Sequence, residues 1–315
     1  MGASVAEDAL PIFGALCRFA AQGELFQNDD TRVIVQTLLK ENKIAEEAGV
    51  ELERKGMFTT GIIAQAGGQR IALYFTGRNH AGENLAQILQ ERIQGLPLPT
   101  QVSDRLAANA PEGYEVDDGG CLDHLRREFY DIRMFFKSSC KYVLKELKII
   151  YRADAIAKKK KMTASERLEL HQEVSLAVME RIKDWGQKEL DEKRVEPNGP
   201  LGKAIKYLIK HYPALTLFTR KEGVPIANSN CEQSLKTPIA VRKMAYFFKT
   251  VEGAAVAAVM FSFIQTCIYS NESVFDYFVA IQRNAKDIRK YPEQWFPWNF
   301  RERLKTLKSK SSNAA

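Results

Sequence analysis

The chain of 315 residues has few histidines and few cysteines, and neither kind stands at the spacing of a catalytic or metal-binding motif. The five cysteines are Cys17, Cys121, Cys140, Cys231 and Cys267. Because their number is odd and they are widely separated, no disulfide framework is indicated, and a reducing compartment is favoured. Three of the four histidines, His80, His171 and His211, are isolated, and no Ser/His/Asp or Cys/His pairing of a nucleophilic hydrolase is indicated.

The sequence also lacks an internal repeat, a secretory signal and a phosphate-binding glycine loop. The pair Gly67-Gly68 lies between two β-branched segments and predicts a hairpin turn. The most apolar stretch, residues 253–269, contains Ser262, Gln265 and Thr266. These polar residues favour a buried core helix over a membrane span, so we expect no membrane partner.

A zinc site at Cys121-Leu122-Asp123-His124 is disfavoured because tetrahedral zinc needs four nitrogen or sulfur ligands. No second Cys or His pair lies at metal-ligand spacing. The start of a helix with a buried cysteine explains this segment better.

The chain does carry an excess of positive charge, and that excess is local. The net charge is +7, from 46 basic and 39 acidic residues. Residues 120–161 alone hold 12 Lys or Arg against 5 Asp or Glu, an excess of 7. A concentrated positive segment favours a polyanionic partner such as nucleic acid, although a solvated helix face gives the same pattern.

The first third of the chain predicts a mixed sheet. Residues 1–27 are expected to form a helical lead-in broken by Pro11 and Gly23, and residues 36–56 a loop or short helix. The β-branched or alternating segments 28–35, 58–64, 70–76 and 100–103 predict strands, and residues 82–94 predict a helix. Asp29 and Asp104 then fall at strand edges, where polar chemistry gathers in such sheets.

From Cys121 the apolar spacing becomes helical. One long helix is predicted as far as Ile150, and a row of six cations follows one side of it: Arg133, Lys137, Lys141, Lys145, Lys148 and Arg152. Thr163-Ala164-Ser165-Glu166 predicts a capping box that opens a second helix. Residues 196–200 break the pattern, and residues 201–211 restart a helix. Two further helices and an aromatic, basic tail are expected after Glu232.

Three acids from distant segments, Asp29, Asp104 and Glu232, could together hold two divalent metals for phosphoryl transfer. Mg²⁺ prefers oxygen ligands, which suits carboxylates better than Cys or His. Glu232 also has a simpler interpretation, because an acid at the start of a helix complements the helix dipole. With 39 acids in the chain, spacing alone does not single out this triple.

Four sequence blocks resemble the transposases of the bacterial insertion sequence 66 family. Asn28-Asp29-Asp30-Thr31 is similar to the family's Ala-Asp-Glu-Thr, and residues 77–85 with Val102-Ser103-Asp104 are similar to the stretch that ends at the second acid. Residues 121–129 resemble Cys-Trp-Ala-His-x-Arg-Arg-Lys-Phe, and residues 225–232 with Arg242-Lys243 resemble Asp-Asn-Asn-x-x-Glu. Residues 291–300 resemble the family's Leu-Pro-Trp ending, so the likeness covers nearly the whole chain.

The resemblance implies a DDE-type transposase that cleaves DNA and transfers strands with Mg²⁺ or Mn²⁺, two ions in all. Its catalytic and metal-binding residues would be Asp29, Asp104 and Glu232, with His124 and Asn228 near the site but without an assigned role. DNA contacts are expected from Arg126, Arg127, Arg133, Lys137, Lys141, Lys145, Lys148, Arg152, Arg242 and Lys243. The implied partners are the element's terminal inverted repeats and target DNA, bound by a homo-oligomer in the bacterial cytoplasm at the nucleoid.

The implied fold class is α/β, a ribonuclease-H-like mixed sheet with helices, interrupted by a large all-helical insertion. The expected domains are a lead-in (1–27), two parts of the catalytic core (28–119 and 223–285), a helical insertion with the basic helix (120–222), and a C-terminal tail (286–315). The chain resembles the catalytic part of the family without its N-terminal DNA-recognition region.

Several positions depart from the family pattern. Ala227 stands for an Asp, Ser229 for an Asn, and Gln233 for the Arg that commonly follows the catalytic Glu. Residues 105–109 replace a Tyr-rich segment, and Asp123 and Glu128 add negative charge to a basic motif. These departures keep open a second function, a truncated or decayed transposase that binds DNA without transposing it. A stand-alone ribonuclease-H-like nuclease is a third alternative, which the helical insertion disfavours.

Overall fold

The computed structural model describes residues 2–312, and these fall into two compact units. Unit 1 takes in residues 2–99, 107–115 and 230–312, and unit 2 takes in residues 100–106 and 116–229. Both units contain strands and helices, so the chain has a mixed α/β fold. Unit 1 is built from three separate stretches of sequence, and its last stretch follows the whole of unit 2.

The strands of unit 1 form an antiparallel sheet in the order β3-β2-β1. They are β1 (Leu25–Arg32), β2 (Phe58–Ala66) and β3 (Gln69–Gly77). The predicted turn between β2 and β3 is confirmed, because Gly67 and Gly68 have φ of +54° and +75°. A residue with a β-carbon rarely adopts such angles, which explains the two glycines.

The predicted position of the first strand was wrong by about three residues. Leu25, Phe26 and Gln27 are buried and pair with β2, so β1 begins before the β-branched run and ends at Arg32. Burial and pairing with β2 therefore set the strand, and local propensity does not. As a result Asp29 lies inside the strand and not at its edge.

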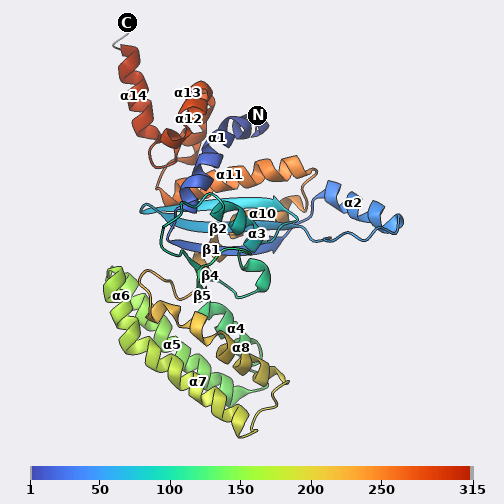
Figure 1. Cartoon of the computed structure of the whole chain (residues 1–315), viewed down its shortest axis with the longest axis vertical. Coiled ribbons are helices and arrows are strands. Elements are labelled where there is room, and N and C mark those ends of the chain that lie inside the picture. Colours follow the sequence, from blue (N-terminus) through green and yellow to red (C-terminus); the bar gives the residue numbers. More distant parts are fainter. Residues whose placement is uncertain (1, 313–315) are drawn as a thin grey trace. The chain divides into compact units, whose positions relative to one another are not determined.

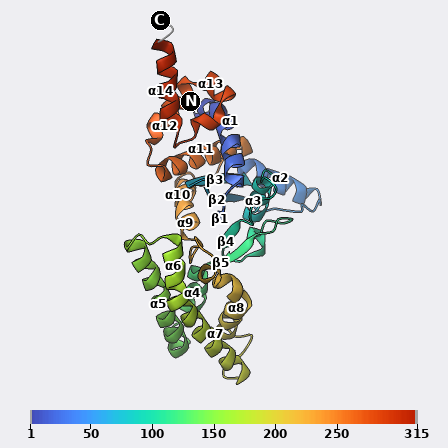
Figure 2. The same cartoon turned by 60° about the vertical axis from the view of Figure 1, so that its left-hand side comes forward.

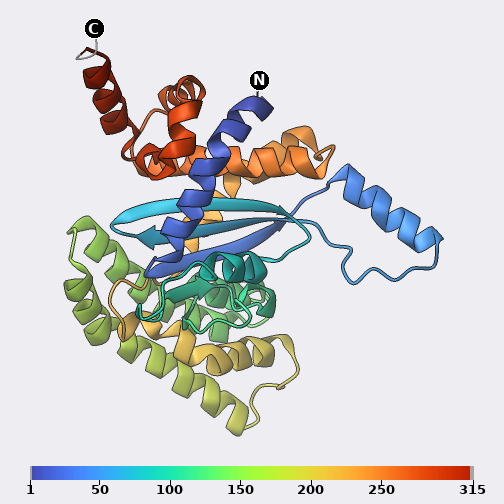
Figure 3. The same cartoon turned by 45° about the horizontal axis from the view of Figure 1, so that its top comes forward.

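The helices of unit 1 surround this sheet. They are α1 (Gly2–Ala21), α2 (Gln36–Glu47), α3 (Ala81–Leu89), η1 (Ala107–Asn109), α9 (Ser229–Ser234), α10 (Lys236–Ala245), α11 (Val251–Tyr269), α12 (Val274–Arg283), α13 (Ala285–Lys290), η4 (Pro292–Trp295) and α14 (Phe300–Ser312). Helix α2 extends away from the strands with Leu38 as its buried residue (Figure 3). The aromatic tail thus contains more helix than the sequence predicted.

Helix α1 runs through Pro11 without a break, which corrects the expected interruption. Pro11 cannot donate to the carbonyl four residues before it, a cost that is offset here by burial of one helix face. Ala9, Ile12 and Leu16 are all completely buried on that face. Tertiary packing therefore overrides the local proline signal.

Among the described helices, α11 is long and apolar enough to cross a membrane, with a mean hydropathy of 1.7. It packs along β3 (Figure 1). The backbone N–H groups of Tyr74 and Ala72 donate to Ser262 Oγ at 2.9 Å and Thr266 Oγ1 at 3.1 Å. These are contacts of a core helix, since they satisfy buried backbone donors at the strand.

Unit 2 combines a short parallel strand pair with a helical bundle. The strands are β4 (Thr100–Ser103), at its predicted position, and β5 (Asp117–Gly120), which the sequence analysis missed. The helices are α4 (Leu122–Asp131), α5 (Lys137–Lys159), α6 (Ala164–Leu170), the π-helical turn η2 (His171–Ser175), α7 (Leu176–Asp191), α8 (Pro200–Leu215) and η3 (Leu217–Thr219). Helices α5 and α7 lie side by side (Figure 2).

The long helix predicted from Cys121 to Ile150 is two helices. Residues 132–136 form a turn between α4 and α5, although Ile132 and Phe136 keep the apolar spacing across it. The helical spacing of apolar residues continues through the turn because both of these residues are half-buried there. The spacing alone therefore could not reveal the turn. The predicted capping box is confirmed, because Thr163 Oγ1 accepts from the Glu166 N–H at 3.2 Å.

Candidate active site

The polar side chains of β1 divide between the two faces of the sheet in strict alternation. On one face, Gln27 Oε1 accepts from Asn230 Nδ2 at 2.8 Å and Thr31 Oγ1 accepts from Arg242 Nη1 at 2.9 Å. Asp29 lies between Gln27 and Thr31 and shares their face, because side chains repeat every second residue in a strand. Asp29 therefore faces the segment that contains α9 and α10.

Helix α9 is held directly over this face of β1 and β2. The thiol of Cys231 donates to the Gly61 carbonyl at 3.2 Å, and the Tyr74 hydroxyl donates to the Ser234 carbonyl at 2.9 Å. Gly61 pairs with Asp29 across the strands. A β-carbon on Gly61 would meet the side chain of Leu235, the residue after α9, at 3.0 Å, so a small residue here favours the close approach of this segment.

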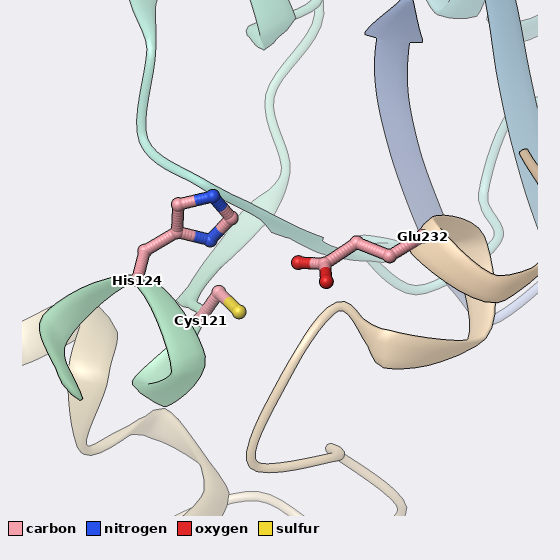
Figure 4. Close-up of side chains that lie close together, drawn as sticks. All are labelled: Cys121, His124 and Glu232. Carbon is pink, nitrogen blue, oxygen red and sulfur yellow. The ribbon is translucent and has the colours of Figure 1, made fainter. Parts of the chain in front are cut away.

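Helix α9, which carries the predicted acid Glu232, therefore lies over the strand face that carries the predicted acid Asp29. Burial raises the pKa of the Cys231 thiol, and the negative charges of Asp29 and Glu232 raise it further. Glu232 lies in α9 and its side chain extends from the helix (Figure 4). Because the raised pKa keeps Cys231 protonated, a thiolate nucleophile is excluded at this position.

The neighbouring Asp30 points to the opposite face and has a structural role. Its carboxylate accepts from Thr60 Oγ1 at 2.6 Å and from the Ala81 N–H at 2.9 Å, and it lies 3.0 Å from His80 Nδ1. It thereby holds the first turn of α3 against the sheet. Asp29 instead accepts from the N–H of Asp30 at 2.8 Å, a contact that orients its carboxylate from within β1.

In unit 2, Asp104 directly follows β4, as predicted. Its Oδ1 accepts from the Leu106 N–H at 3.0 Å, and the intervening Arg105 has a left-handed φ of +70°. The Tyr207 hydroxyl donates to the Asp104 carbonyl at 3.2 Å. Burial raises the pKa of Tyr207, and nearby Cys121 and Asp104 raise it further, so this tyrosine stays a hydrogen-bond donor.

Cys121 anchors a second part of unit 2 next to Tyr207. Its sulfur accepts from the Asn228 N–H at 3.2 Å, while the Leu122 N–H donates to the Ile226 carbonyl at 3.0 Å. These bonds fix the segment that leads into α9. His124 lies in the first turn of α4, and Cys121 directly precedes that helix (Figure 4). Asn228 is completely buried.

Five of the ten predicted DNA-binding cations lie exposed on α5. Lys137, Lys141, Lys145, Lys148 and Arg152 repeat every three or four residues and are all exposed. At 100° per residue they fall on one side of the helix. Arg133 does not belong to this row as predicted, because it lies in the turn before α5 and its guanidinium stacks 3.5 Å from the centre of the Tyr130 ring.

The other predicted cations lie on two different helices. Arg126 and Arg127 are exposed on α4, and Arg126 lies 5.2 Å from the centre of the Tyr130 ring. Arg242 and Lys243 lie in the last turn of α10. Arg242 is tied to β1 through Thr31, so its guanidinium is held at the end of that strand.

The sequence profile described as "Transposase IS66 family" matches residues 10–256. The chain belongs to the IS66 transposase family. The matched region of this IS66-family protein contains all three predicted acids and the exposed cations of α5. The helices α12, α13 and α14 follow it.

Two proteins of Sinorhizobium fredii (strain NBRC 101917 / NGR234) are similar to part of this IS66-family chain. The uncharacterized protein y4qI is 25% identical over 188 residues, which cover 58% of this chain and 34% of that protein. The uncharacterized protein y4jD is 26% identical over 187 residues, covering 58% of this chain and 35% of that protein. This chain therefore spans about a third of the length of the curated relatives that it matches.

Four residues that position the candidate groups were missed by the sequence analysis: Gln27, Gly61 and Asn230 in unit 1, and Tyr207 in unit 2. Gln27 and Asn230 bond across a separation of 203 residues, and Gly61 admits α9 to the sheet. The alternation of side chains along β1 could have indicated that Gln27 lies on the same face as Asp29. The roles of Gly61 and Tyr207 depend on packing and have no local signal.

Proposed function

We propose that this chain carries the catalytic centre of a DDE-type transposase, which cleaves DNA and transfers strands with a divalent metal. Asp29, Asp104 and Glu232 are the proposed catalytic acids. The observation that supports the proposal most is the position of α9 over β1, with Asp29 on the strand face below it. The helix that carries Glu232 thereby lies over the strand that carries Asp29, although the two are far apart in sequence.

The residues suit a hard divalent cation. Asp29 and Glu232 offer carboxylate oxygens, which Mg²⁺ and Mn²⁺ prefer. Their two negative charges both act on the buried Cys231, and such a concentration of like charge favours a bound cation. We propose that Asp29, Glu232 and Asp104 hold two such ions, which would stabilise negative charge on the phosphate undergoing displacement.

The chain's own groups define the remaining chemistry. Cys231 stays protonated, and Asp30 is engaged at the start of α3, so neither acts as a nucleophile. The attacking group must then come from outside these side chains. Water would attack during cleavage, and the freed 3′-hydroxyl of DNA would attack during strand transfer, with Asp29 held in place by β1.

The wider proposal follows from family membership and the exposed cations. The fold would be ribonuclease-H-like, and the helices between Asp104 and Glu232 would form its insertion. Arg126, Arg127 and the cations of α5 would contact DNA phosphates, because they are exposed and solvent-facing. The chain would act on inverted repeats and target DNA as a homo-oligomer in the cytoplasm.

Nicking of supercoiled DNA with candidate inverted repeats, in Mg²⁺ and in Mn²⁺, tests the proposal. Asp29→Ala and Glu232→Ala are each expected to abolish nicking while the melting temperature changes little. Asp30→Asn is the matched control: it removes hydrogen bonds at α3 and is expected to cost about 1–3 kcal/mol of stability. We expect this variant to melt at a lower temperature and still to nick DNA.

Wild-type nicking by Asp29→Ala would refute the assignment of the acids. A wild-type chain that binds DNA in a salt-sensitive manner but never nicks it would instead favour the decayed, DNA-binding alternative. The two outcomes are separated by measuring binding and nicking on the same preparation.

A further inference from the structure

A pocket of about 620 Å³ lies where β1 ends, three residues beyond Asp29. Its floor includes the apolar Val33 and Met57, which are 7% and 8% exposed. Three cations, Arg32, Lys55 and Arg242, also line it, and none of its lining residues is acidic. Every residue of this pocket belongs to unit 1.

The walls of the pocket are fixed by backbone contacts. The Phe248 N–H donates to the Ile34 carbonyl at 2.8 Å, and the Gln36 N–H donates to the Phe248 carbonyl at 2.9 Å. Arg242 also donates to the Arg32 carbonyl. The segment after α10 is therefore attached to the chain beyond β1, and the pocket is preformed.

An exposed aromatic residue borders the pocket in an unfavourable backbone conformation. Tyr246 ends α10 with a φ of +64°, and it is 74% exposed. A left-handed conformation costs a bulky residue about 1–2 kcal/mol, which the burial of its side chain does not offset here. Glycine or asparagine would be expected at such a position if only the turn mattered.

We propose that this pocket binds one unstacked nucleotide of the DNA strand, with its base against Tyr246 and its phosphates beside the three cations. An apolar floor, an exposed aromatic ring and cations without acids are the combination that binds single-stranded nucleic acid. The proposal rests on the proposed function, because it concerns the same DNA substrate. Asp29 and Arg32 are about 10 Å apart along the strand, about three stacked nucleotides.

Binding of a short oligothymidylate to the full chain in EDTA tests the proposal, with an abasic oligonucleotide of the same length as the second ligand. Tyr246→Gly is the informative variant, because glycine adopts a φ of +64° without strain and the fold should be at least as stable. We expect it to weaken oligothymidylate binding about tenfold, the effect of losing one stacked base. Abasic binding is expected to be unchanged.

Two matched variants complete the experiment. Tyr246→Phe is expected to keep wild-type affinity, because its ring still stacks. Phe275→Ala removes another exposed aromatic ring of unit 1, which is 77% exposed on α12, and is expected to change neither affinity.

Equal loss of affinity for both oligonucleotides, unchanged affinity in Tyr246→Gly, or no oligothymidylate binding by the wild-type chain would each overturn the proposal. Because the assay contains no divalent metal, a failure of nicking would refute the proposed function and leave this result standing.

Discussion

Gly61 controls how closely α9 approaches the sheet, so a larger residue there should separate Glu232 from Asp29. Gly61 pairs with Asp29 on one side and Tyr74 on the other. An added β-carbon would lie 3.0 Å and 3.1 Å from two atoms of Leu235. Carbon atoms pack best at about 3.5–4.0 Å, so the β-carbon alone requires the Leu235 side chain to move by a few tenths of an ångström, and a larger side chain requires more.

Gly61→Ala and Gly61→Val should therefore differ sharply. Alanine requires a shift of a few tenths of an ångström by a flexible leucine, and it restricts the unfolded chain, so the net stability change should be near zero. Valine adds two more methyl groups in the same space and should destabilise unit 1 by about 1–3 kcal/mol. A displacement of about 1 Å at a catalytic acid lowers the rate about a hundredfold.

The assay is metal-dependent nicking by folded protein, with urea unfolding of the same variants. We expect Gly61→Val to lose about a hundredfold in nicking at a temperature where it is fully folded. Adding Leu235→Ala to Gly61→Val should restore part of the nicking rate, because it removes the leucine side chain that the valine would contact. Gly77→Val is the control in β3, because no atom lies within 4 Å of its added β-carbon.

Full nicking by Gly61→Val, together with wild-type stability, would refute the argument that α9 must touch β2 at this point. A Leu235→Ala change that fails to restore activity would show that the loss arises elsewhere in the sheet.

Two further predictions concern unit 2. Burial alone would raise the pKa of Asp154, but the nearby His171 and Lys158, at 3.6 Å and 2.8 Å, and the guanidinium of Arg167, which donates two hydrogen bonds to it, hold this pKa below its ordinary range. This contribution is fully present above the ordinary aspartate pKa of about 3.9 and is lost progressively as the pH falls from there through the lower pKa of the folded state. Asp154→Asn should therefore cost about 3 kcal/mol in urea unfolding at neutral pH and less at pH 3, where the loss is under way but incomplete; an equal cost at both would contradict the ion-pair explanation. Replacing Lys141 and Lys145 by Ala should reduce the slope of log affinity for DNA against log salt concentration by about 2. As a control, replacing Lys305 and Lys308, which are exposed on α14, should leave this slope unchanged.

Local chemistry predicted several elements at or near their true positions. The Gly67-Gly68 turn and the Thr163 capping box were confirmed, because each depends on residues within a few positions of one another. The strand 100–103 was placed correctly from its alternation and the preceding prolines. The positions of Asp104 and of the exposed cations on α5 followed from these signals.

Long-range packing determined what the sequence could not reveal. Asp29 lies within β1 because Leu25 and Phe26 are buried against β2, a pairing with no local signature. Alternation alone puts Gln27 and Asp29 on one face, but the hydrogen bond from Asn230 to Gln27 joins residues 203 positions apart and has no local signal. The catalytic role of the acids, implied by family resemblance, stays a prediction for the nicking assay.

Unit 1 is interrupted in sequence, and this has a consequence for how the protein is made. Gln27 and Asn230 are 203 residues apart, so α9 leaves the ribosome long after β1. At about 5–20 residues per second, the ribosome needs about 10–40 s to synthesise the intervening chain. During that interval the nascent chain carries Asp29 without Glu232, so the proposed DNA-cutting centre, which needs both, cannot act until the chain has been synthesised past Glu232.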